Sequence, residues 1–250
     1  MSVRHVETVM GVPVSLVLRA PDDARSRAAV RAAFDRLHAA DARFSPYRQD
    51  SELCRYARGQ VPVPSGELRE VLDLAEAARR ASGGAFDVRR PDGTLDTNGV
   101  VKGWAAQRTA DQLRADGFHD LCLNAGGDVV AVGRAEHGRP WVVGVRSPFR
   151  RDALLARVEV VDGAVATSGT YERGAHVWDG RTGCPAESLV AATVVAGDLT
   201  AADVLATSVL ALGPDGVSWA AGQGASLVLA VRPDGEVISA GVAAPAAAAR

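Results

Sequence analysis

The sequence is poor in the features that mark disulfide-rich, membrane-spanning or nucleic-acid-binding proteins. Only three of its 250 residues are cysteine, and they lack the paired spacing of a zinc site or a disulfide framework. No run of eighteen apolar residues occurs, so we predict no membrane span. An odd number of unpaired cysteines is typical of reduced thiols, and we therefore expect a cytoplasmic protein.

An excess of charge of one sign is also absent. The chain has 28 basic and 30 acidic residues, which leaves a formal net charge of −2. With this balance, no overall electrostatic attraction to nucleic acid is expected, and a partner has to be recognised locally. The first residues carry Arg4, His5 and Glu7 where a secretory signal needs an unbroken apolar stretch, which agrees with the cytoplasmic expectation.

Hydrophobic residues make up 47% of the chain, which is enough for a substantial core. Helix and strand patterns are mixed along its length, and no linker-like segment interrupts them. We therefore predict one α+β domain over residues 1–241, with antiparallel or mixed sheets and packed helices. The Ala/Pro-rich tail over residues 242–250 is predicted to be disordered.

Hydrophobic periodicity places the main elements. We predict helices over residues 23–41, 66–82, 103–117 and 201–212. Strands are predicted over residues 5–10, 12–18, 121–124, 129–132, 141–146, 154–161, 190–196, 226–231 and 236–239. Residues 43–53 have no sustained period and are predicted to form an ordered loop, a common place for binding residues.

A carboxylate and a hydroxyl recur at helical spacing in residues 200–207. Thr200 and Asp203 have the spacing of a capping box, so Asp203 could be a carboxylate of the first helical turn. Thr207 lies one turn further along the same face, so both oxygen-bearing side chains project from one stripe. Oxygen ligands of this kind suit Mg²⁺, and the pattern leaves both interpretations open.

Two glycine-containing segments could contact an anionic ligand. Asn124–Asp128 is typical of a hairpin turn, although bare glycine backbone also lets a ligand approach N–H groups closely. Lys102 lies between Gly99 and Gly103 just before a predicted helix, where the helix N-terminus and the ammonium could hold a phosphate. The spacing of a Walker loop is absent.

The densest polar cluster covers residues 166–171 and 176–183. With an ordinary pKa of ~6.5, His176 could act as a general base at neutral pH, although a lone histidine can equally be structural. Ser168 and Thr182 could equally be turn residues, because no nucleophile elbow accompanies them.

In this order, the segments closely resemble the FAD:protein FMN transferase family, also called the ApbE family. The resemblance covers nearly the whole chain. Its motifs are Met10-Gly11, Phe44–Glu52, Gly84–Asp87, Leu95–Gly103, Asn124–Asp128, Ala166–Tyr171, His176–Gly183 and Ala202–Thr207.

The resemblance implies a T-fold-like α+β enzyme that cleaves FAD, attaches FMN through a phosphoester to a Thr or Ser hydroxyl of an acceptor protein, and releases AMP. It implies Mg²⁺ bound by Asp203, Thr207 and the main-chain carbonyl of Val101. His176 matches the proposed base, and Lys102 would hold the anion. The residues expected around the flavin nucleotide are Met10, Tyr47, Asp96, Asn124, Ala125, Gly126, Gly127, Asp128, Ser168 and Thr182.

Two departures from the family pattern are visible. Residues 88–94 form a bare connection where family members usually carry an insert, and the missing segment could shape the acceptor site or one side of the FAD pocket. Gly180 replaces the family's usual proline, which is expected to loosen its loop. Two other functions remain open: an FAD pyrophosphatase, in which water replaces the acceptor hydroxyl, and a flavin-binding protein without turnover.

Overall fold

The structure is a computed structural model that describes residues 1–150, 152–170 and 177–241. Its strands are β1 (Val3–Val9), β2 (Val12–Leu18), β3 (Leu121–Ala125), β4 (Asp128–Val132), β5 (Trp141–Arg146), β6 (Leu154–Val160), β7 (Gly163–Gly169), β8 (Trp178–Asp179), β9 (Cys184–Pro185), β10 (Ala191–Ala196), β11 (Leu227–Val231) and β12 (Val237–Gly241). Its helices are α1 (Ala24–Phe44), α2 (Glu52–Ala57), α3 (Gly66–Ala81), α4 (Asn98–Ala115), α6 (Leu199–Leu212) and α7 (Asp215–Gly222), with a short 3₁₀ turn at Glu136–Gly138.

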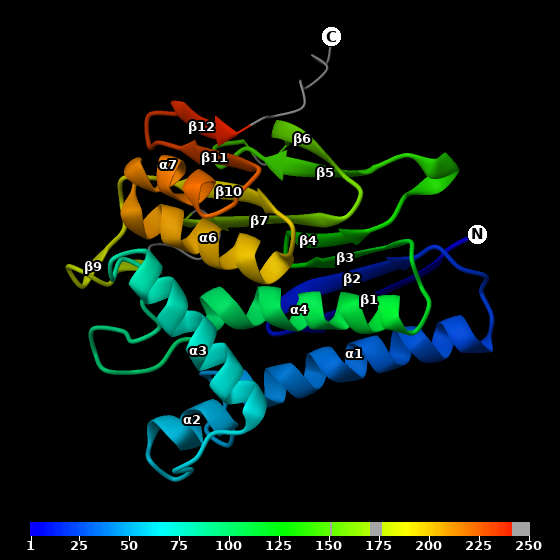
Figure 1. Ribbon diagram of the computed structural model, residues 1–250, viewed down its shortest axis with the longest axis horizontal. Helices are drawn as coiled ribbons and strands as arrows, with labels where there is room; N and C mark the ends of the chain where they lie inside the picture. Colours follow the sequence, from blue (N-terminus) through cyan, green and yellow to red (C-terminus); the bar gives the residue numbers. More distant parts are fainter. Residues whose placement is uncertain (151, 171–176, 242–250) are drawn as a thin grey trace.

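The centre of the fold is an eight-stranded sheet with the order β1-β2-β3-β4-β7-β10-β11-β12. Neighbouring strands pair antiparallel throughout, which confirms the α+β expectation. Most connections join strands that are adjacent in the sheet, whereas the helices α1 to α4 are inserted between β2 and β3. After these helices, the chain re-enters the sheet at β3, directly beside β2 (Figure 1).

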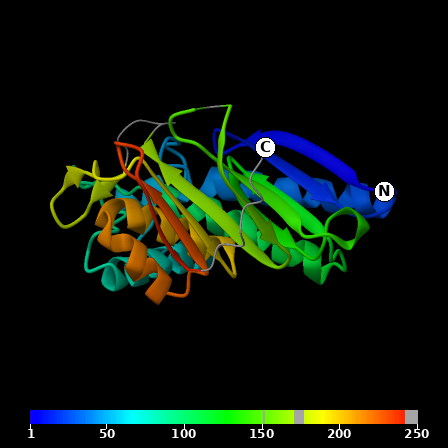
Figure 2. The same cartoon turned by 90° about the horizontal axis from the view of Figure 1, so that it is seen from above.

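The helices cover one face of this sheet. Helix α1 lies against β1, α4 against β3 and β4, and α6 against β7 and β10. Seen from above, the helices lie along one side, and the first and last strands stand at opposite ends of the sheet (Figure 2). Apolar residues at helical spacing, such as Val30, Phe34 and Leu37 of α1, are buried in this layer.

The hairpin of β5 and β6 packs against the opposite face and closes a second, smaller core. Val143 and Val158 of the hairpin are buried there with Val129, Val165 and Leu229 of the main sheet. Because both of their faces are covered, β4 and β11 are buried at every position, and their residues are all apolar except Asp128 at the start of β4.

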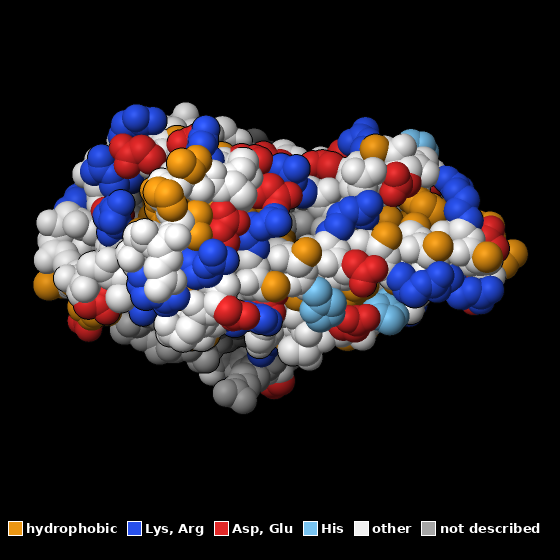
Figure 3. All heavy atoms as spheres, turned by 90° about the horizontal axis from the view of Figure 1, so that it is seen from below, with side chains coloured by type: hydrophobic (Ala, Val, Ile, Leu, Met, Phe, Trp, Pro, Cys, Tyr) orange, Lys and Arg blue, Asp and Glu red, His pale blue; other side chains and the backbone are white. Residues whose placement is uncertain are grey.

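The surface shows the charge balance that the composition indicates. Basic and acidic side chains are interspersed over the face seen from below (Figure 3). In the part of the chain that the structure describes, no helix is both long enough and apolar enough to cross a bilayer.

The predicted helices over residues 23–41 and 66–82 agree with α1 and α3. The N-cap of α1 is Asp23, whose side chain accepts a hydrogen bond from the Ser26 N–H. The elements α2, α7 and β7 were not predicted. Four of the seven residues of β7 are Gly or Ala, which are depleted in strands, so its sequence gives a weak strand signal. Its pairing with β4 and β10 stabilises it instead.

Two predicted helix starts are wrong. Helix α4 begins at Asn98 rather than at residue 103, because its glycines lie inside the helix and allow close packing. Helix α6 begins at Leu199, and its N-cap is Asp198, whose side chain accepts from the Ala201 N–H. The interpretation of Thr200 and Asp203 as a capping box is therefore also wrong. The predicted tail over residues 242–250 lies outside the described residues, and the extent of the domain stays a prediction.

Helices α4 and α6 approach each other closely at Gly103. A Cβ atom at this position would lie 2.6 Å from the carbonyl oxygen of Leu199 and 2.8 Å from Cβ of Asp203. We expect Gly103→Ala to lower the free energy of unfolding by about 1–3 kcal/mol, because the two helices have to move apart. Urea unfolding measures the change.

The matched control is Gly222→Ala at the end of α7, where an added Cβ meets nothing within 4 Å. This change should shift the free energy of unfolding by less than about 1 kcal/mol, towards greater stability. Equal stability of the Gly103→Ala variant and the unmodified chain would contradict the close packing of α4 on α6.

Candidate functional site

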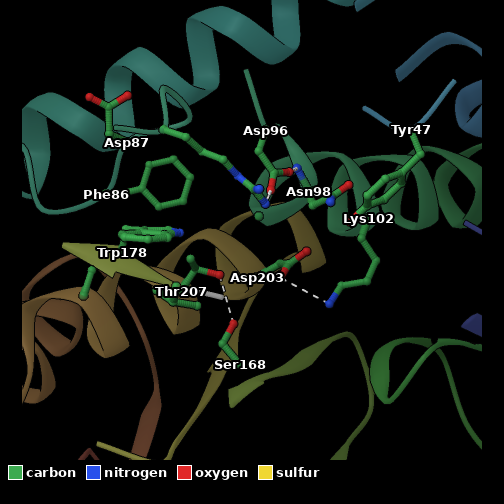
Figure 4. A pocket seen from close by; sticks show the side chains of 14 residues that line it. Tyr47, Phe86, Asp87, Asp96, Asn98, Lys102, Ser168, Trp178, Asp203 and Thr207 are labelled. Atoms are coloured by element: carbon green, nitrogen blue, oxygen red, sulfur yellow. Dashed lines mark hydrogen bonds and ion pairs between the residues drawn. The ribbon is translucent and has the colours of Figure 1, made fainter. Parts of the chain in front are cut away.

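A cleft of about 240 Å³ opens where α4, α6, β7 and β8 meet. It is lined by Tyr47, Phe86, Asp87, Arg90, Asp96, Asn98, Gly99, Lys102, Ser168, Val177, Trp178, Asp203, Thr207 and Ala211. A second cavity of about 270 Å³ shares Tyr47, Asn98 and Lys102 with the cleft. The fold thus brings six of the predicted site residues into one cleft: Tyr47, Asp96, Lys102, Ser168, Asp203 and Thr207 (Figure 4).

Asp203 lies in the second turn of α6 and is only 2% exposed. One oxygen, Oδ2, accepts a hydrogen bond from the Gly103 N–H at 2.9 Å, and Oδ1 is 3.6 Å from Nζ of Lys102. Burial raises the pKa of Asp203 from its ordinary 3.8 to about 7, although the Lys102 charge opposes the shift. The carboxylate is therefore held in a position where its negative charge is poorly stabilised by the protein alone.

Asp128 provides a second buried carboxylate next to the same lysine. It is 1% exposed, and its Oδ1 accepts a hydrogen bond from the Thr167 N–H at 2.8 Å. Its other oxygen forms an ion pair with Lys102, and the nearby charge of Asp128 contributes to the raised pKa of Asp203. Two buried carboxylates thus share one ammonium, an arrangement that favours the approach of a further positive charge.

Thr207 follows Asp203 by one helical turn and lines the cleft beside it (Figure 4). Its Oγ1 lies 2.9 Å from Oγ of Ser168 in β7. The start of α4 passes over this pair, since a Cβ built on Gly99 would lie 3.5 Å from Oγ1 of Thr207. Gly99 therefore allows the end of one helix to approach the hydroxyl on the other.

Asp203 and Thr207 together suit a hard divalent cation. Mg²⁺ usually takes one or two carboxylates, and water and phosphate complete its octahedron, so a carboxylate and a hydroxyl opening into one cleft fit it. Over the described ranges, no three acidic, histidine or cysteine side chains converge to hold a metal by themselves. Val101 lines the adjoining cavity, and a role for its carbonyl stays a prediction.

Asp96 and Met10 lie at the margins of the two cavities. Oδ1 of Asp96 accepts a hydrogen bond from the Asn98 N–H at 3.0 Å, so the carboxylate caps the start of α4. Met10 lines the second cavity and has a φ of 54°, a left-handed conformation that is uncommon for a residue with a side chain. Tyr47 is 78% exposed and stands between the cavities.

The segment Asn124–Asp128 has the hairpin geometry that its glycines indicate. Gly126 and Gly127 form the two-residue turn between β3 and β4 with φ values of 64° and 104°. Oδ1 of Asn124 accepts from the Gly127 N–H at 2.8 Å. Residues 124–127 line neither cavity, and only Asp128 reaches the site, through Lys102. A contact of Asn124, Ala125, Gly126 and Gly127 with flavin stays a prediction.

Thr182 and Gly180 lie in the turn between β8 and β9. Thr182 does not line the cleft, and its Oγ1 accepts from the Cys184 N–H at 3.2 Å, so its role towards flavin stays a prediction. The expected loosening at Gly180 is wrong: its N–H donates to the carbonyl of Ala85 at 2.9 Å, and a Cβ there would collide with the carbonyl of Gly84. His176 lies outside the described residues.

Sequence reasoning missed several cleft residues. Phe86 and Trp178 form an apolar wall beside Thr207, and Asn98 stands at the start of α4 (Figure 4). All three lie inside segments that carry the family resemblance, so the motifs indicated their neighbourhood. Arg90 lies in the shortened connection, outside every motif, and only the fold brings it into the cleft.

Comparison with known proteins finds the same family over most of the chain. A family model described as "ApbE family" matches residues 10–90 and 88–229. The two pieces meet within the connection that the sequence analysis predicts to be shortened. The FAD:protein FMN transferase of Salmonella typhimurium is 30% identical over 161 residues, which cover 60% of this chain and 45% of that protein. That of Rhodobacter capsulatus is 37% identical over 110 residues, which cover 40% and 20%.

The chain therefore spans less than half the length of these relatives. The flavin transferase ApbE from Vibrio cholerae superimposes with a TM-score of 0.85 at 22% identity, covering 96% of this chain and 97% of that one. The ApbE protein from Thermotoga maritima superimposes with a TM-score of 0.82 at 22% identity, covering 95% and 96%. These structural likenesses show that the fold is shared.

The raised pKa of Asp203 predicts how stability depends on pH in metal-free buffer. Ionisation of Asp203 costs the folded protein more than the unfolded chain, so its contribution to stability is present below about pH 4 and is lost as pH rises through about 7. We expect Asp203→Asn, which cannot ionise, to lack this loss. The free energy of unfolding of the unmodified chain, measured in EDTA, should fall relative to that of Asp203→Asn between about pH 4 and pH 7. If the difference in free energy of unfolding between the two proteins does not change with pH, the raised pKa of Asp203 is wrong.

Proposed function

The chain belongs to the ApbE family, and from this membership together with its cleft we propose that it is a flavin transferase. It would cleave FAD, attach FMN through a phosphoester to a Thr or Ser hydroxyl of an acceptor protein, and release AMP. Relatives with up to 37% identity carry the name FAD:protein FMN transferase, which supports the proposal.

One observation supports the proposal most strongly. Asp203 and Thr207 open into a cleft that also contains Lys102, and all three residues lie within the part of the chain that the family model matches. A buried carboxylate with a raised pKa is costly to keep in a protein. The cost is understandable if a divalent cation binds there, since such an ion stabilises the charged form.

We propose that Asp203, Thr207 and the carbonyl of Val101 hold Mg²⁺. When bound, the ion would supply Lewis-acid chemistry by neutralising charge on the diphosphate of FAD. The protein's own contribution is to hold these ligands in place. The Gly103 N–H positions the Asp203 carboxylate, and the Ser168 hydroxyl positions that of Thr207.

Lys102 would balance charge rather than act alone as a phosphate clamp. Its ammonium lies against Asp128 and near Asp203, so its positive charge offsets part of the negative charge of this buried pair. The start of α4 would assist, because Asn98 and Gly99 line the cleft and the N-terminus of a helix favours anions. The diphosphate of FAD would then lie between the beginning of α4 and the second turn of α6.

We propose that His176 accepts the proton of the acceptor hydroxyl. The hydroxyl oxygen forms a bond to the phosphorus of the FMN half, the bond between that phosphorus and the bridging oxygen breaks, and AMP leaves with the bridging oxygen. His176 directly precedes Val177, which lines the cleft. A positioned base of this kind typically contributes about 10²–10⁴-fold in rate.

The second cavity would take the flavin ring. Its lining combines apolar Met10, Val12 and Phe44 with the exposed ring of Tyr47, a composition that suits a large planar aromatic group. Because Asn98 and Lys102 line both cavities, a dinucleotide could extend from one into the other with its diphosphate near these two residues.

Incubation with FAD, Mg²⁺ and a candidate acceptor tests the proposal. Mass spectrometry should find FMN added to a Thr or Ser side chain of the acceptor, with one AMP released for each FMN attached. Release of FMN and AMP without labelling of any acceptor would identify an FAD pyrophosphatase instead. Tight FAD binding without release of AMP would identify a flavin-binding protein.

Asp203→Asn should abolish FMN transfer, because the neutral amide is a weak ligand for a hard cation. The fold should persist, since Asp203 is not the N-cap of α6, and circular dichroism measures this. Asp152→Asn is the control: Asp152 is exposed and lies outside the cleft, so transfer should remain normal. Full Mg²⁺-dependent transfer by the Asp203→Asn variant would remove Asp203 from the metal site.

A further inference from the structure

The shortened connection between residues 88 and 96 is a compact, hydrogen-bonded turn. Arg89 and Leu95 pair as an isolated antiparallel bridge, and the Asp96 N–H donates to the carbonyl of Val88 at 2.8 Å. Inside this bridge, the Arg90 N–H donates to the carbonyl of Thr94 at 2.9 Å. Arg90 therefore lies in a turn closed by backbone hydrogen bonds, and its side chain lines the cleft.

The guanidinium of Arg90 is directed by Asp96. Nη2 of Arg90 donates to Oδ2 of Asp96, and the other oxygen of this carboxylate caps the start of α4 through the Asn98 N–H. The Asp96 side chain is 17% exposed, whereas that of Arg90 is 37% exposed. Asp96 thus links the guanidinium to the N-terminus of α4, which is the part of the helix that lines the cleft.

The charges around the cleft indicate what Arg90 can bind. The lining of the cleft contains the carboxylates of Asp87, Asp96 and Asp203, and the cations Arg90 and Lys102. Lys102 already lies between two buried carboxylates. A guanidinium has five N–H donors in a planar fork, and the bond to Asp96 uses one of them. The other N–H donors of the guanidinium have the spacing to bind two phosphate oxygens at once.

We propose that Arg90 binds non-bridging phosphate oxygens of the dinucleotide's diphosphate, and that Asp96 is the positioning residue that orients its guanidinium. The inference rests on the proposed function, because it takes FAD as the ligand of the cleft. It assigns a task to the connection where family members usually carry an insert: in this chain, Arg90 completes that side of the pocket.

Binding measurements on the full chain test the proposal. We would titrate the unmodified protein and the variants Arg90→Ala, Arg90→Lys and Arg90→Gln with FAD, ADP and riboflavin in EDTA, following heat or flavin fluorescence. ADP carries a diphosphate without a flavin, and riboflavin carries a flavin without a phosphate. Arg90→Ala should weaken FAD and ADP by about tenfold or more, as expected for the loss of a charge-assisted bond. Its affinity for riboflavin should not change.

Arg90→Lys should bind FAD more tightly than Arg90→Gln does, because a lysine keeps the charge and loses only the fork. Arg89→Ala is the matched control: Arg89 is the neighbouring residue of the same turn, is exposed, and does not line the cleft. Its affinities for FAD and ADP should stay within about twofold of those of the unmodified chain. Steady-state kinetics provide a second readout, since the loss of phosphate binding should raise KM for FAD more than it lowers kcat.

The outcomes separate this inference from the proposed function. FAD and ADP affinities of Arg90→Ala within twofold of the unmodified chain would overturn the role of Arg90, even if FMN transfer is normal. An equal loss for riboflavin would also overturn it, because a purely structural effect is not confined to phosphate. If FAD binds through Arg90 as expected but no acceptor is labelled, the transferase proposal fails and the phosphate site stands. An unmodified chain that binds neither FAD nor ADP, both in EDTA and with Mg²⁺ added, overturns both.

Discussion

The site depends on one ammonium placed between two buried carboxylates. Lys102 on α4 contacts Asp128 at the start of β4 and lies 3.6 Å from Asp203 on α6. Charges of this kind are expensive to bury, and removal of one partner leaves the others uncompensated. The positions of the sheet and of both helices are therefore coupled through these three side chains. Because two carboxylates face a single ammonium, the cluster favours the binding of a further cation.

Close helix packing makes this charge cluster possible. Because Gly103 has no side chain, α6 can approach α4 so closely that the N–H of Gly103 donates to the carboxylate of Asp203. Gly99, one turn earlier, brings the start of α4 close to Thr207. The same two glycines that suggest a phosphate-binding loop in the sequence thus act through the packing of one helix on another. Their effect is to bring the beginning of α4 to the carboxylate and hydroxyl of α6.

The turn over residues 88–96 contributes a charged side chain to the cleft. Arg90 reaches the cleft because a bridge between Arg89 and Leu95 closes the turn, and because Asp96 ties its guanidinium to α4. A short, closed turn restricts the side chain that it carries, whereas a long insert would add new surface. The turn can therefore contribute a fixed charge to the pocket.

Periodicity and local motifs, read from the sequence by itself, determined the α+β class, the principal strands, the helices α1 and α3, and the segments that surround the site. These features follow from short-range preferences and from alternation, which are written into neighbouring residues. Only the tertiary structure decided that α4 begins at Asn98, that Asp203 is not part of a cap, and that Arg90 enters the cleft. The start of α4 and the entry of Arg90 depend on packing between distant segments or on a turn closed by the fold, whereas the cap of α6 at Asp198 is a local contact that periodicity does not reveal. The Gly103 N–H that holds Asp203, for example, comes from a residue one hundred positions away.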